Sequence, residues 1–186
     1  ADPYVLGVSG GAAVAALVAI MLGLPAAGVD GLAALGALAA CLLVFALAQG
    51  PGGWTPTRLL LTGIVVAAGA GSVVSLLLAL GDDTRLRGMV FWMLGDLSGT
   101  RRWPWLLGLL AVATVAGVLL GRHLNVLARG AAQAASVGMD VRRLQVLLFV
   151  GSSVLTGCAV SAAGSIGFVG LVTPHIARLA LGSDNR

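Results

Sequence analysis

Five long stretches without a charged residue constrain this chain more than any other feature. They cover residues 3–29, 31–57, 59–81, 103–121 and 144–177. A helix that crosses a bilayer needs about 20 predominantly apolar residues, and the first four stretches are each near the length of one span. The fifth has 34 residues and is broken by several glycines and a proline. We therefore expect spans over about 5–23, 31–49, 58–80, 103–121 and 143–163, with a turn and a short helix over 174–182 after them.

The composition excludes most soluble classes of protein. Of the 186 residues, 59% are hydrophobic and 10% are charged, and the mean hydropathy is +1.03. An ordinary soluble domain is about 45–50% apolar and about 25% charged, and a chain this short could not bury so much apolar surface in one core. The eleven arginines lie in short clusters between apolar runs rather than in one basic stripe. A soluble enzyme and a nucleic-acid-binding domain are thus excluded, and an all-α polytopic membrane helix bundle is predicted.

The connections between the expected spans differ in kind. Residues 49–57 form a turn rich in glycine and proline. Residues 82–102 hold four arginines around a Met/Phe/Trp-rich centre, which indicates a short interfacial helix over 85–95. Residues 122–143 hold four more arginines around a polar surface helix over 125–138. Five arginines on one side of the membrane against six on the other do not decide the orientation.

The spans lack the groups that drive chemistry or ion coupling. No expected span carries a charge at its centre, whereas an ion-coupled carrier usually keeps one there. Cys41 and Cys158 read as free buried thiols, and His123 and His175 have no metal-ligand spacing. No catalytic constellation and no phosphate-binding glycine loop is present in the sequence. We therefore expect no catalytic residue, no metal and no cofactor on this chain, with any energy supplied from outside it.

Glycine makes up 28 of the residues, and much of it lies within the spans. Small residues let helices approach closely in lipid, and such close packing accounts for most of these glycines. Broken helices can also line a pathway, because exposed backbone is tolerated at membrane depth beside protein or water. The sequence favours such a helix break at Gly164, Gly167, Gly170 and Pro174.

Three segments resemble the permease subunits of the FecCD type. Residues 1–12 read ADPYVLGVSGGA, residues 91–95 read FWMLG, and residues 164–178 read GSIGFVGLVTPHIAR. The three segments occur in the same order and at similar separations in that family. FecCD-type permeases are the membrane subunits of ATP-binding cassette (ABC) importers for iron-siderophores, haem and vitamin B12.

The resemblance implies a ten-helix subunit, of which this chain would span about helices three to eight as a fragment. It implies a homodimer with a second permease subunit, two ATP-binding subunits that hold ATP and Mg, and a periplasmic or lipid-anchored substrate-binding protein. It places residues 49–57 and 122–143 on the cytoplasmic side of the bacterial inner membrane and residues 82–102 on the periplasmic side. Membrane lipid is an expected partner, whereas nucleic acid is not.

The resemblance also assigns roles to residues of this chain. ATPase coupling would fall to Asn125, Arg129, Gly130, Gln133, Ala134 and Gly138. Ala131 stands where the family often has an acidic residue, so that coupling would depend on shape, Arg129 and Gln133. The cytoplasmic gate would be Thr55, Pro56 and Thr57, although helix capping before Arg58 explains the threonines equally well. Binding-protein docking would involve Arg85, Arg87, Arg101 and Arg102, for which lipid-interface snorkelling is the alternative.

The resemblance leads us to expect a permease subunit, not an enzyme, of an importer for an iron chelate, either a ferric siderophore or haem. A cobalamin permease of the same family is the alternative. An ion-coupled secondary transporter and a membrane scaffold without transport are the rivals from other classes. An ion-gradient-driven flux without ATP would indicate the former, and no flux at all the latter.

Overall fold

The computed structural model describes residues 7–50, 55–95, 103–164, 172, 173, 175–177 and 179. Seven helices follow one another in this part of the chain: α1 (Val8–Met21), α2 (Ala26–Leu47), α3 (Pro56–Leu80), α4 (Asp83–Leu94), α5 (Trp103–Ala128), α6 (Ala131–Ser136) and α7 (Val141–Ala163). Residues 172, 173, 175–177 and 179 are also helical, and the rest of the expected 174–182 helix lies outside the described residues. The prediction of an all-α helix bundle is confirmed.

Four helices are long and apolar enough to cross a membrane. They are α2, α3 from Thr57, α5 from Leu106, and α7, with mean hydropathies of 2.2, 2.3, 1.7 and 1.9. α1 has 14 residues and is therefore about 21 Å long, shorter than a hydrocarbon core of about 30 Å. The four long helices make the chain a multi-pass membrane protein.

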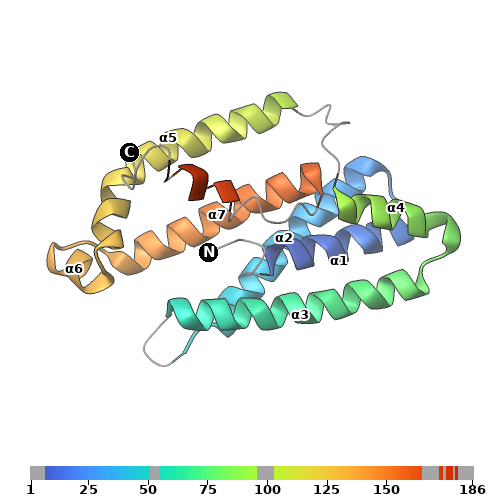
Figure 1. Cartoon of the computed structure of the whole chain (residues 1–186), viewed down its shortest axis with the longest axis horizontal. Helices are drawn as coiled ribbons and strands as arrows, with labels where there is room; N and C mark the ends of the chain where they lie inside the picture. Colours follow the sequence, from blue (N-terminus) through green and yellow to red (C-terminus); the bar gives the residue numbers. More distant parts are fainter. Residues whose placement is uncertain are drawn as a thin grey trace.

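α1 lies at the centre of the bundle, where it packs against α2, α3, α4 and α7 (Figure 1). Val8, Ala12, Ala16, Leu17 and Ala19 of this helix are completely buried. Most of these side chains are alanine, so the core is held together by close approach of helices rather than by large side chains. This type of packing is typical of membrane proteins, where lipid competes for large apolar groups.

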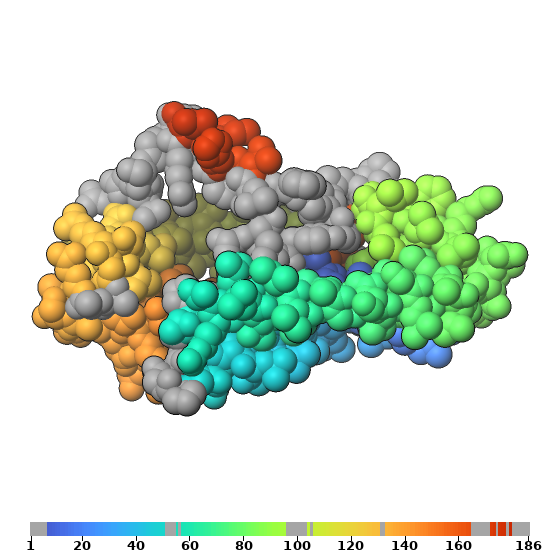
Figure 2. Space-filling view, turned by 60° about the horizontal axis from the view of Figure 1, so that its bottom comes forward, coloured from blue at the N-terminus to red at the C-terminus, as the bar shows by residue number. Residues whose placement is uncertain are grey.

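The outer helices leave wide apolar faces open. α3 runs along one face of the molecule as an outer layer (Figure 2). α5 lies apart from α1, α2 and α3, and it contacts α6 and α7 (Figure 1). In the 18-residue segment that makes each helix apolar enough to span a membrane, only 11% of α3 and 6% of α5 is buried inside the structure. Lipid or further helices can cover such faces at no hydrophobic cost.

Local sequence signals explain where several helices begin and end. Thr55 and Asp140 are the N-caps of α3 and α7, and their side chains accept hydrogen bonds from the backbone N–H groups of Arg58 (3.3 Å) and Arg143 (3.1 Å). α2 begins at Ala26, directly after Pro25, and includes Asp30 in its second turn. α5 continues past the expected span end at 121 to Ala128. Arg122 and His123 mark the membrane surface, but neither residue type ends a helix.

Candidate functional site

α1 and α2 cross at a contact between two glycines. A Cβ atom on Gly11 would lie 2.5 Å from the carbonyl oxygen of Gly36 and would also collide with Ala40. A Cβ atom on Gly36 would in turn collide with the Gly11 carbonyl and lie 2.5 Å from the Ala15 Cβ atom. The two backbones therefore touch, and neither position has room for a side chain.

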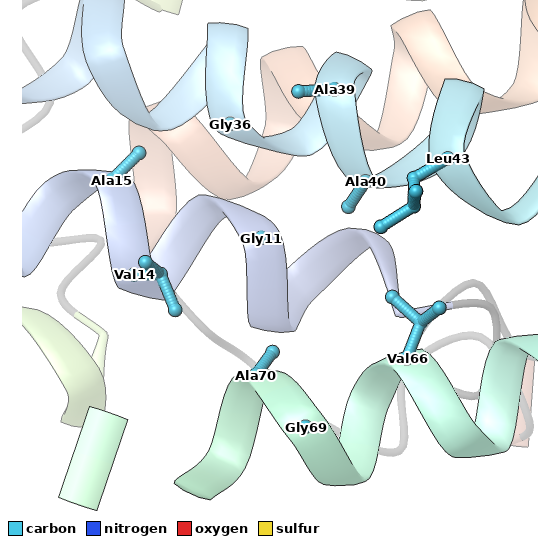
Figure 3. A pocket seen from close by; sticks show the side chains of 10 residues that line it. All are labelled: Gly11, Val14, Ala15, Gly36, Ala39, Ala40, Leu43, Val66, Gly69 and Ala70. Carbon is cyan, nitrogen blue, oxygen red and sulfur yellow. The ribbon is translucent and has the colours of Figure 1, made fainter. Parts of the chain in front are cut away.

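An apolar groove of about 470 Å³ opens beside this crossing, between α1, α2 and α3 (Figure 3). It is lined by ten small or aliphatic residues: Gly11, Val14, Ala15, Gly36, Ala39, Ala40, Leu43, Val66, Gly69 and Ala70. Leu43 of α2 and Val66 of α3 converge at one end of the groove, and Ala70 points from α3 toward α1 (Figure 3). None of these ten side chains carries a polar group, so the groove can hold alkyl groups or another helix but cannot bind a charge.

The expected gate residues lie at the start of α3. Thr55 is its N-cap, Pro56 is its first residue, and Thr57 is exposed. Capping thus accounts for Thr55, while Thr57 makes no capping bond among the hydrogen bonds of the described residues. The Arg58 guanidinium lies against Gly50, which brings the start of α3 close to the beginning of the connection that follows α2.

The expected coupling segment is divided between two helices. Asn125 lies in the last turn of α5, whereas Gln133 and Ala134 belong to the short helix α6. Gly130 with φ 124° and Gly138 with φ 80° flank α6, and these backbone angles favour glycine at both positions. Arg129 and Gln133 are exposed and Ala134 is completely buried, so α6 presents a polar face to the outside and an apolar face to its neighbours.

α6 connects two membrane-spanning helices at their ends. It packs against both α5 and α7, in the turn that joins them (Figure 1). A force applied to α6 would therefore act on both helices at once.

The surface helix α4 carries Arg85 and Arg87, both of which are exposed. α4 is held to the bundle by Met89, which is completely buried with Ala13 and Leu17 of α1 and Val74 of α3. The two arginines are thus held on a fixed surface at one end of the bundle. The other two expected docking residues, Arg101 and Arg102, lie outside the described residues.

The expected helix break begins at Gly164, where α7 ends. Gly164 has φ 77°, and a Cβ atom there would lie 2.6 Å from the Trp92 carbonyl oxygen and 2.7 Å from the Gly95 Cα atom. The end of α7 therefore packs directly on the end of α4, and both ends carry a glycine with positive φ. Gly167, Gly170 and Pro174 lie outside the described residues. Across the described part of the chain, no group of three His, Cys or acidic residues comes together as a metal site would require.

The model of the FecCD transport family matches residues 1–186, which is the whole chain. The chain belongs to the FecCD transport family. It is 42% identical to the cobalamin import permease BtuC of Halobacterium salinarum, 39% identical to the ABC transporter permease YvrB of Bacillus subtilis and 36% identical to the hemin permease HmuU of Yersinia pestis. All of this chain is covered in each case, against 51%, 55% and 58% of the relatives, so the chain spans about half of their length.

A solved structure supports the same family fold. An ABC transporter described as being of the metal-chelate type, in an inward-facing conformation, matches with a TM-score of 0.83 and 28% identity. The match covers all of this chain and 60% of that one. The predicted resemblance to FecCD permeases is confirmed by the family match and by this structure.

Two contacts in this FecCD chain were not predicted from its sequence. Gly36 is one glycine in a run of small residues, and nothing in the run indicates that it meets Gly11. The thiol of Cys41 in α2 donates a hydrogen bond to the Ser153 hydroxyl in α7, with 2.8 Å between Sγ and Oγ. A four-residue spacing of small and polar residues along both helices is the signal that could have indicated this seam.

Proposed function

We propose that this chain is part of the permease subunit of an ABC importer that carries an iron chelate, either a ferric siderophore or haem, across the bacterial inner membrane. The observation that carries the proposal is the FecCD family match over the whole chain. The 0.83 TM-score against a transporter of the metal-chelate type supports the same class of cargo. The hemin permease among the relatives supports haem in particular.

Cobalamin is the second candidate cargo, because relatives with 42% and 39% identity are named as cobalamin or vitamin B12 permeases. Cobalamin and haem are both large metal chelates built around a macrocyclic ring. An apolar groove such as the one beside Gly11 offers no charge that would select between them. Measurements of uptake must therefore distinguish the two cargoes.

The proposed mechanism uses α6 as the coupling element. Two partner subunits would hold and hydrolyse ATP with Mg, and their movement would press on Arg129, Gln133 and the flanking Asn125. Because α6 packs against α5 and α7, the push would be transmitted to both spans and from there to the pathway. Gly130 and Gly138 would allow the tight turns that hold α6 in place, and Ala134 would fix its inner face.

The proposed pathway runs along the exposed small-residue face of α3, at the interface with a second permease subunit. A Cβ atom added to Gly71 of this helix would meet no atom within 4 Å beyond its own turn of helix, so this side of α3 is open. Thr55, Pro56 and Thr57 would form the cytoplasmic gate. The helix break at Gly164, Gly167, Gly170 and Pro174 would contribute backbone polar groups to the same pathway.

Arg85 and Arg87, at the opposite end of the bundle, would meet acidic groups of a substrate-binding protein together with Arg101 and Arg102. Charges at the rim of an interface steer encounter more than they add affinity. Replacement of these arginines would therefore slow delivery of the cargo and make it less sensitive to salt.

The test is ATP-dependent uptake into liposomes that contain the full-length protein and its ATP-binding subunits. Iron-siderophore, haem and cobalamin are each supplied with the loaded binding protein. ATP-dependent uptake of an iron chelate supports the proposal, and uptake of cobalamin alone supports the second candidate. Uptake that follows an ion gradient without ATP would contradict both and indicate a secondary transporter.

A further inference from the structure

A second cavity lies where α5 and α7 meet the turn that joins them, at the membrane boundary. It has a volume of about 450 Å³. Its walls come from Leu120 and His123 of α5, Val137 and Asp140 of the turn, and Arg143 and Leu147 of α7. The spanning helix α5 ends at this boundary and the spanning helix α7 begins there. The cavity therefore extends from the membrane surface inward between two spans.

Along both helices the lining becomes apolar with depth, and Val137 and Met139 add apolar groups at the turn. Along α5, Leu120 lies about one turn deeper than His123, and along α7, Leu147 lies about one turn deeper than Arg143. Leu147 is 55% exposed although it lies within a spanning helix. The cavity thus offers donor groups at the surface and an aliphatic wall beneath them, in the order in which a phospholipid presents its phosphate and its acyl chains.

The surrounding charge favours an anion. Residues 122–143 carry four arginines and one aspartate. The aspartate, Asp140, pairs with Arg143 at 2.9 Å between Oδ2 and Nε, but the two side chains are 54% and 89% exposed, and an exposed pair of this kind is weak. The pair occupies only the Nε–H group of Arg143, so the other guanidinium donors remain able to bind a phosphate.

We propose that this cavity binds an anionic phospholipid. The phosphate lies between Arg143 and His123, and one acyl chain follows Leu120 and Leu147. Basic cavities between membrane helices are suited to anionic lipid headgroups, and each arginine near an anionic surface contributes about 1 kcal/mol, which corresponds to about fivefold in affinity. The proposal requires only that α5 and α7 cross the bilayer, so it stands apart from the proposed transport function.

The test is native mass spectrometry of the full-length protein, titrated with phosphatidylglycerol and with phosphatidylcholine of the same acyl chains. We expect phosphatidylglycerol to bind about fivefold more tightly or better. Arg143→Gln should weaken phosphatidylglycerol binding about fivefold. Arg142→Gln is the matched control, because it removes the same charge one residue away, at a position that does not line the cavity; it should weaken binding less than Arg143→Gln does, because it leaves the charge-assisted contact with the phosphate in place.

Two further variants separate the cavity from general surface charge. Asp140→Asn removes the opposing carboxylate and keeps the N-cap of α7, since asparagine caps helices as well as aspartate does. It should strengthen phosphatidylglycerol binding, because it removes a negative charge and frees the Nε–H group of Arg143 for the phosphate. Leu147→Trp fills the apolar part without a change of charge and should weaken the binding of phosphatidylglycerol, with unfolding temperatures measured to show that both variants remain folded.

Three results would overturn the proposal. Equal effects of Arg143→Gln and Arg142→Gln, with none from Leu147→Trp, would indicate diffuse attraction to the surface. Inorganic phosphate that binds alone with the same dependence on Arg143 would indicate an ion site. Equal binding of the two lipids by the parent protein would show that the cavity has no lipid preference, as would be found if further helices or the partner ATPase cover it.

Discussion

Cys41 and Ser153 form the central pair of a seam that joins α2 to α7. The Cys41 thiol donates to the Ser153 hydroxyl, which itself donates to the Phe149 carbonyl oxygen at 2.7 Å. On one side of the pair the rings of Phe45 and Phe149 lie 5.5 Å apart, and on the other Ala37 approaches Gly157. The two helices are therefore antiparallel, with contacts every four residues.

Replacement of Ser153 by alanine should destabilise the full-length protein modestly. Hydrogen bonds between membrane helices contribute about 0.6 kcal/mol on average, and a double-mutant cycle with Cys41→Ala should give a coupling energy of that size. Unfolding by detergent titration in bicelles measures it. Ser152→Ala is the control, because its hydroxyl donates to the same Phe149 carbonyl but is exposed; an equal loss in the control would contradict an interhelical role.

Gly11→Ala should separate α1 from α2 and lower the unfolding free energy by about 1–3 kcal/mol, the usual cost of forcing extra volume into a packed core. Gly71→Ala is the matched change on α3, where a Cβ atom meets nothing within 4 Å. There, the better helix propensity of alanine should stabilise the protein by up to about 1 kcal/mol. Thermal unfolding of the two variants side by side tests the contrast, and equal shifts would be inconsistent with a glycine crossing.

Thr55 and Thr57 should respond differently to alanine. Thr55→Ala removes the N-cap of α3 and should cost about 1 kcal/mol of stability, while Thr55→Ser should restore it. Thr57→Ala should leave stability unchanged, since Thr57 is exposed and is not the cap. If Thr57 belongs to the proposed gate, liposome uptake falls in that variant without any change in unfolding temperature; unchanged uptake would remove Thr57 from the gate.

Arg129→Asp should uncouple ATP hydrolysis from uptake. Charge reversal on the exposed face beside α6 changes the sign of the charge at the contact proposed with the ATPase, and a mismatched charge in an interface can cost several kcal/mol. We expect uptake to fall at least about tenfold while ATP hydrolysis continues. Arg122→Asp, an equal reversal on the same side of the protein but within α5, is the control, and unchanged transport by Arg129→Asp would argue against α6 as the coupling element.

Much of the fold could be predicted because the bilayer imposes a simple rule on length and charge. The helical class follows from apolar stretches such as 59–81, and the family follows from motifs such as FWMLG over 91–95. The helix ends are harder, because a charge marks the membrane boundary rather than the end of a helix. For this reason α5 runs past Arg122 to Ala128 and α2 includes Asp30.

The partners of individual residues could not be predicted. A glycine shows that two backbones can approach, but not which two, so Gly11 and Gly36 could not be paired from the sequence. Cys41 reads as an isolated buried thiol until α2 and α7 are placed together. The coupling helices expected over 125–138 are separated at Gly130, whose φ of 124° does not fit within an α-helix, and the sequence does not show where that break falls.

The glycine crossing of α1 and α2 also limits how this protein can move. A contact made of two backbones has no side chain that could change rotamer, so it cannot absorb a small displacement and still remain packed. We therefore expect α1 and α2 to move together as one rigid unit. In the proposed transport cycle, alternation between inward and outward states would then come from the loosely packed helices, which are α3 on one side of that unit and α5, which packs against α6 and α7 instead.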